Sequence, residues 1–119
     1  MHNSSQWILR LSMELEHAEI AHRNGNEGRA RVCARRAAGI VIGEFLRRNE
    51  LPDPDPSALD RLRSLAAKED VSEEIRTSAA HFLMKITPEN KLPIEVDLIA
   101  EVHWLAEILL GYPPDSSTQ

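Results

Sequence analysis

The chain is poor in cysteine and in long apolar runs. Cys33 is the single cysteine among 119 residues, so no internal disulfide can form, and we expect a reducing, cytoplasmic location. No basic region precedes an apolar stretch near Met1, so no signal peptide is expected. The longest run of apolar residues and glycine, 37–43, is far shorter than the roughly 20 residues that span a bilayer. The sequence therefore predicts no disulfide scaffold and no membrane partner.

Aromatic residues and positive charge are also scarce. Phe, Trp and Tyr make up 4% of the chain, and the formal net charge is −5. A negatively charged protein does not attract nucleic acid as a whole, so an anion site would have to be a local patch. The length and the 42% hydrophobic content are typical of one globular domain. We expect a single domain over residues 1–119, with an ordered core at about 5–112 and a flexible tail at 113–119.

Hydrophobic periodicity predicts five helices and no strands. The helices are expected at about 5–23, at 27–49 after an Asn26 cap, after caps at Ser57 and Ser72, and at about 94–111. The core face of the fourth helix extends to Ile86. The expected fold class is all-α, an up-and-down bundle of four to five helices.

The second expected helix has the features of a central one. It is apolar nearly all round over residues 37–46, which is typical of a helix surrounded by others. Gly39 and Gly43 lie four residues apart and would allow a neighbouring helix to approach closely. Cys33 points towards the core and is expected to be a small packing residue.

Two expected helices carry a second apolar stripe opposite their core face. Together with Met84, the stripes form a candidate interface for a dimer or another protein: Leu9, Met13, Ile20, Met84, Trp104 and Ile108. If the stripes are adjacent, the apolar surface is larger than a lone bundle usually exposes. Self-association is the simplest explanation, so we expect a homodimer. The alternative is that the third helix or a loop covers them.

The segment Arg76-Thr77-Ser78-Ala79-Ala80-His81 places a permanent cation and a proton-exchanging group five positions apart. Arginine can donate two hydrogen bonds to a phosphate, and histidine titrates near neutral pH. Five helical positions turn through about 500° and rise about 7.5 Å, so the two side chains are not stacked in one subunit. They fit a site completed across a dimer. Alternatively, Arg76 pairs with an acid such as Glu73, and His81 is an ordinary surface residue.

Four arginines form the densest basic cluster: Arg29, Arg31, Arg35 and Arg36. They are candidates for a rim that binds RNA or phosphate. The alternative, which we prefer, is a solvated face that forms salt bridges beside the acidic first helix.

Two acid–histidine pairs on the first helix suggest a metal site only superficially. Glu14 with His17, and Glu19 with His22, share one helix and point in different directions, whereas bundle di-metal sites need the motif on two helices. We therefore expect no metal and no cofactor. His22 falls on the apolar face and is expected to be at least half-buried.

Three segments together resemble the HEPN (higher eukaryotes and prokaryotes nucleotide-binding) family. Residues 14–24 (ELEHAEIAHRN) resemble the family's first helix, and residues 30–48 (ARVCARRAAGIVIGEFLRR) its central helix, which is rich in small residues. Residues 76–81 fit its R-x4-6-H signature. The resemblance covers about residues 7–111. Thr77 departs from the family, which often has asparagine, aspartate or histidine directly after the arginine.

The resemblance implies a helical bundle that often dimerises. Many members are metal-independent ribonucleases in toxin–antitoxin, defence or RNA-processing systems, and others accompany small nucleotidyltransferases. By resemblance, Arg76 would hold the scissile phosphate, His81 would transfer a proton, Thr77 would assist by hydrogen bonding, and a 2′-hydroxyl would attack. The alternative is a non-catalytic interaction or nucleotide-binding module. The partners implied are RNA or a nucleotide, an antitoxin, or a nucleotidyltransferase.

Overall fold

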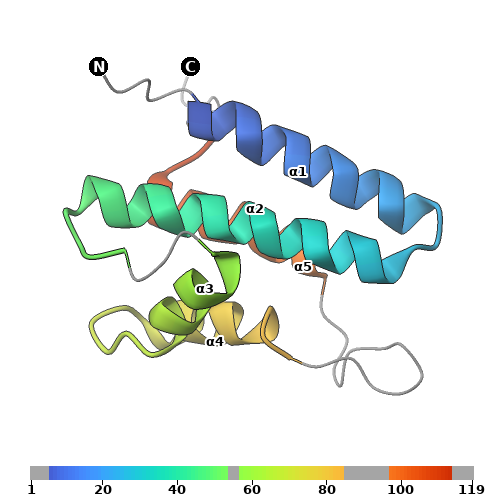
Figure 1. Cartoon of the computed structure of the whole chain (residues 1–119). Helices are drawn as coiled ribbons and strands as arrows, with labels where there is room; N and C mark the ends of the chain where they lie inside the picture. Colours follow the sequence, from blue (N-terminus) through green and yellow to red (C-terminus); the bar gives the residue numbers. More distant parts are fainter. Residues whose placement is uncertain (1–5, 54–56, 85–96, 114–119) are drawn as a thin grey trace, which may run out of the picture.

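The computed structural model describes residues 6–53, 57–84 and 97–113, and within these ranges it contains five α-helices and no strand (Figure 1). The helices are α1 (Gln6–Arg23), α2 (Glu27–Arg48), α3 (Ala58–Ala66), α4 (Glu73–His81) and α5 (Leu98–Leu110). The prediction of an all-α domain is confirmed. No helix in the described ranges is long and apolar enough to cross a membrane.

Helix α2 lies at the centre of the fold. Helices α1, α3 and α5 all pack on it, and α4 packs on α3 and α5 (Figure 1). The side chains at the middle of α2 are fully buried: Ala37, Ala38, Val41 and Ile42. Cys33 is buried in the same helix. The structure confirms the predicted central helix and the packing role of the cysteine.

The two glycines of α2 mark the place where α3 crosses it. A Cβ atom on Gly39 would lie 2.7 Å from the Cβ and 2.9 Å from the Cα of Ala58. A Cβ atom on Gly43 would lie 2.5 Å from a guanidinium nitrogen of Arg61. Arg61 itself donates to the Gly39 carbonyl at 3.0 Å and pairs with Asp53 at 2.6 Å. The absence of two side chains thus brings α3 onto α2 and fixes the position of α4 beyond it.

Side-chain caps set the starts of four helices. The caps each accept a hydrogen bond from the backbone N–H three residues later: Asn26, Ser57, Ser72 and Asp97. The first three confirm the predicted caps. Asp97 is the cap of the fifth helix, which begins at Leu98; residues 94–96, where its start was expected, lie outside the described residues. Gly111, with a φ of 64°, ends that helix in the left-handed conformation that glycine adopts without strain.

Helix α4 is shorter than its apolar pattern predicts. It ends at His81, because the N–H groups of Phe82 and Leu83 donate to carbonyls three residues earlier and tighten the last turn. The fully buried Phe82 still packs in the core. Two further expectations fall outside the described residues: the core role of Ile86 and the tail from residue 114.

Candidate functional site

Arg76 lies on α4, but its guanidinium reaches back towards the end of α3. Its Nη1 atom donates to the backbone carbonyls of Lys68, Glu69 and Val71, each at 3.2 Å. These carbonyls belong to the connection between α3 and α4, beyond Ala66, the last residue of α3. Within one subunit Arg76 therefore anchors the α3–α4 connection. The alternative that it pairs with Glu73 does not hold, because its partners are carbonyls.

Two further arginines bind helix ends in the same way. The Nε of Arg35 donates to the Phe82 carbonyl at 2.8 Å, and its Nη2 makes a longer bond of 3.5 Å to the Met84 carbonyl. The Nη1 of Arg48 donates to the Leu110 carbonyl at 3.1 Å. The carboxyl ends of α3, α4 and α5 are thus each held by an arginine. Burial lowers the pKa of Arg35 from its ordinary value.

The remaining arginines of the basic cluster are distributed differently. Arg29 and Arg36 are exposed, whereas Arg31 is half-buried and its Nε lacks a hydrogen-bond partner. Burial, and secondly the charge of Arg35, lower the pKa of Arg31. Over the described part of the chain, none of these three forms an ion pair, so the salt-bridged face expected beside α1 is not found.

His81 faces α5 and lies beside a carboxylate. Its Nδ1 is 3.3 Å from Oε2 of Glu101, which is close enough for an ion pair. The alignment is not that of a hydrogen bond, and Nδ1 is buried without one. The other carboxylate oxygen, Oε1, accepts a hydrogen bond of 2.5 Å from the buried hydroxyl of Ser78. Glu101 thus contacts two side chains, Ser78 and His81, on one face of α4.

These residues form part of a groove between α4 and α5. The groove has a volume of about 570 Å³ and is lined by Glu73, Glu74, Thr77, Ser78, His81, Ala100, Glu101 and Trp104. The structure therefore brings Thr77 and His81 together, and the described residues that line the groove do not include Arg76. Three carboxylates at one groove give it a negative potential, which opposes the approach of a phosphodiester.

Sequence reasoning missed Ser78 and Glu101. Glu101 lies 20 positions after His81 on another helix, and only the packing of α4 against α5 joins them. The only signal in the local sequence was that Ser78 and His81 are three positions apart, which places them on the same face of α4.

The apolar residues proposed as an interface are exposed, apart from Met84, which is half-buried. Leu9, Met13 and Ile20 are 64%, 50% and 40% exposed, and we call them the outer face of α1. Trp104 and Ile108 of α5 are 38% and 53% exposed. Both helices pack mainly on α2 and little on each other. The expectation that these stripes reach solvent is confirmed, whereas their role in binding stays a prediction.

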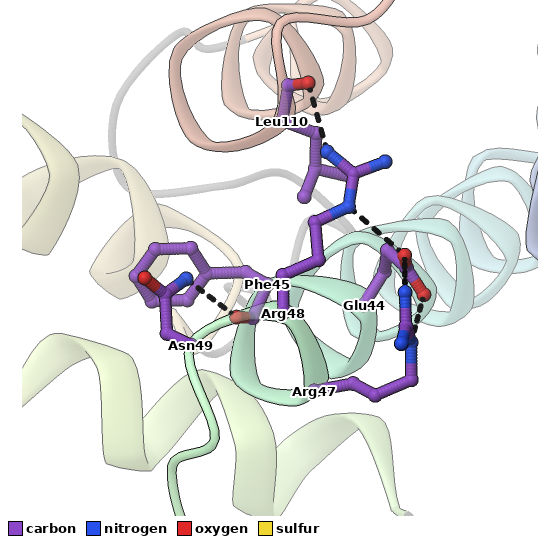
Figure 2. Close-up of polar contacts among 6 residues, drawn as sticks. All are labelled: Glu44, Phe45, Arg47, Arg48, Asn49 and Leu110. Atoms are coloured by element: carbon purple, nitrogen blue, oxygen red, sulfur yellow. Dashed lines mark hydrogen bonds and ion pairs between the residues drawn. The ribbon is translucent and has the colours of Figure 1, made fainter.

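A second polar cluster, in the last turns of α2, ties α2 to α5 (Figure 2). The buried carboxylate of Glu44 accepts hydrogen bonds from Arg47, at 3.0 and 2.6 Å, and from Arg48 at 2.9 Å. These hydrogen bonds, chiefly those from Arg47, hold the pKa of Glu44 below its ordinary value, although burial alone would raise that pKa. Arg48 also lies over the ring of Trp7, with its Cζ 5.5 Å from the ring centroid.

His22 differs from its prediction. It is exposed, and its Nδ1 lies 2.9 Å from Oε2 of Glu27, because the turn after α1 directs the ring towards the start of α2. In the ranges that the structure describes, no three metal-binding side chains cluster.

Comparison of the chain with protein-family models, with curated proteins and with solved structures gave no match. The HEPN resemblance therefore rests on residues 14–24, 30–48 and 76–81 alone and stays a prediction.

Proposed function

We propose that this chain is a non-catalytic interaction module, a HEPN-like up-and-down bundle that binds another protein and, in the first place, a second copy of itself. The observation that carries the proposal is the outer face of α1. Leu9, Met13 and Ile20 lie in solvent on the side opposite the buried Leu11 and Ala18. An ordinary surface helix has polar residues on this side. Since each of these side chains is about half exposed, covering it would contribute on the order of 1 kcal/mol to association.

The surroundings of Arg76 and His81 favour this module over catalysis within one subunit. The Nη1 of Arg76 already donates to three carbonyls, which holds the guanidinium at the α3–α4 connection and leaves only its other two nitrogens for a phosphate. His81 faces a groove with three carboxylates, which would repel an RNA backbone. Both features suit a fold in which these residues stabilise helix packing.

Light scattering of the purified chain across the micromolar range tests the proposal. The expected mass is twice the 13.4 kDa of one chain, and it should fall towards 13.4 kDa on dilution. A mass of 13.4 kDa at every concentration would contradict self-association.

A metal-independent ribonuclease with a composite dimer site is the second candidate function. The observation that favours it is the carboxylate of Glu101 beside His81, because an acid next to a histidine can orient the ring for proton transfer. In such a site, Arg76 of one copy would serve together with His81 of the other, through the guanidinium nitrogens other than the Nη1 that binds the carbonyls.

Incubation with structured and single-stranded RNA in the presence of EDTA separates the two functions. The interaction module predicts no cleavage. The ribonuclease predicts cleavage that His81→Ala abolishes at an unchanged melting temperature. Cleavage that persists in His81→Ala would remove this histidine from the mechanism, and cleavage lost in EDTA would indicate a metal.

A further inference from the structure

We infer that the groove between α4 and α5 binds an arginine side chain presented by a segment of a partner protein. The inference rests on the proposed function as an interaction module and names the chemistry of the partner. Its basis is the combination, in one groove, of the carboxylates of Glu73, Glu74 and Glu101 with the exposed indole of Trp104.

The acidic rim of the groove begins with Glu73 and Glu74 in the first turn of α4. Both side chains are exposed, and within the part of the chain that the structure describes neither forms an ion pair. Glu101 contributes a third carboxylate from α5, and its side chain is 24% exposed. Three negative groups from two helices converge on one groove, so the complementary occupant carries positive charge.

The wall of the groove is mainly apolar, and Trp104 supplies its aromatic surface. The indole is 38% exposed although it belongs to a helix of the core. A guanidinium stacks on an indole face and at the same time donates paired hydrogen bonds to a carboxylate. A lysine ammonium is more strongly hydrated and cannot form this planar arrangement, so the geometry favours arginine.

The size of the groove indicates a chain segment and not an isolated ion. A volume of about 570 Å³ accommodates a long side chain together with neighbouring backbone. A flexible segment of a partner can therefore place its arginine between α4 and α5.

The test is a titration of the full chain, labelled with ¹⁵N, with a blocked peptide of sequence Gly-Arg-Gly-Arg-Gly. The control peptide replaces both arginines by citrulline, which keeps the shape and removes the charge. We expect the indole N–H resonance of Trp104 to shift with the arginine peptide, while that of Trp7, packed against Tyr112, stays in place. The citrulline peptide should bind about tenfold more weakly, and added salt should weaken the arginine peptide. Equal binding of the two peptides would overturn the inference.

Matched variants locate the binding. The double change Glu73→Gln with Glu74→Gln should weaken the arginine peptide about fivefold, and Trp104→Leu should do the same. Glu107→Gln removes an exposed acid of α5 that does not line the groove, so it should leave binding unchanged. Equal weakening by Glu107→Gln would assign the effect to overall charge and contradict the inference.

Two outcomes separate this inference from the proposed function. If the arginine peptide does not bind although light scattering shows a dimer, the groove assignment fails and the interaction module stands. If the Trp104 resonance shifts with protein concentration in the absence of peptide, a second copy occupies the groove, and the assignment to another protein is overturned.

Discussion

Arg35, Arg48 and Arg76 apply the same chemistry at three helix ends. Each donates to backbone carbonyls at or just beyond the end of a helix. In the sequence these arginines are only positive charges, and this is why Arg35 and Arg76 are candidates there for binding phosphate. The hydrogen-bond partners of Arg35 and Arg76 are backbone carbonyls, which are the same in every residue and leave no mark in the sequence. Roles of this kind emerge only from the tertiary structure.

Arg76→Met tests the anchoring role, because methionine keeps an apolar stem and removes the donors. Leaving three carbonyls without their partner should lower the free energy of unfolding by about 1–2 kcal/mol, measured by thermal or urea unfolding. Arg36→Met is the control, since Arg36 is exposed and should change stability by less than about 0.5 kcal/mol. An unchanged stability in Arg76→Met would mean that the guanidinium is free for a ligand.

Glu44 makes stability depend on pH. Its pKa is held low in the folded chain, chiefly by the hydrogen bonds from Arg47, so its contribution is present above its ordinary pKa of 4.5 and is lost as the pH falls through the lowered folded value. Glu44→Gln should cost about 1–2 kcal/mol at neutral pH, and the cost should shrink in acid. Urea unfolding at several pH values measures both effects. A cost that is constant through the acid range would contradict the assignment to Glu44.

At the scale of helices, local chemistry explains most of the starts and fewer of the ends. Asn26, Ser57 and Ser72 are recognisable as caps in the sequence, because a short polar side chain precedes each apolar pattern. The end of α4 was not recognisable. Apolar residues continue beyond His81, and the carbonyl of Phe82, which caps the helix, is bound by Arg35 from 47 positions earlier in the chain. Distant contacts of this kind are absent from any local pattern.

The crossing of α2 and α3 can be tested by adding one methyl group. Gly39→Ala places a Cβ atom 2.7 Å from the Cβ of Ala58 and close to its backbone, so α3 must shift. We expect a loss of about 1–3 kcal/mol in the free energy of unfolding. Gly28→Ala is the matched control in the same helix, where the nearest atom is 4.0 Å away, and it should stabilise by up to about 1 kcal/mol. If both changes stabilise the chain, the close crossing is not present.

At the scale of the whole molecule, the exposed residues were more predictable than the groove. The stripes of α1 and α5 follow from helical periodicity, because a residue opposite the core face of an outer helix has no neighbour to cover it. The groove follows from the packing of α4 on α5, which brings Glu73 and Glu101 to one surface from positions 28 residues apart in the chain. A sequence read along its length indicates which residues face outwards, but not which of them meet.

The most direct test of the interaction module is sedimentation velocity of a variant with a polar outer face on α1. The triple variant replaces the outer face by glutamine, a good helix former: Leu9→Gln, Met13→Gln and Ile20→Gln. Its control is Leu59→Gln, which changes an exposed apolar residue of α3. We expect a dimer for the parent chain and for the Leu59→Gln control. For the triple variant we expect a monomer of 13.4 kDa whose helical circular dichroism is unchanged. If the triple variant sediments like the parent chain, the protein does not bind its partner through the outer face of α1.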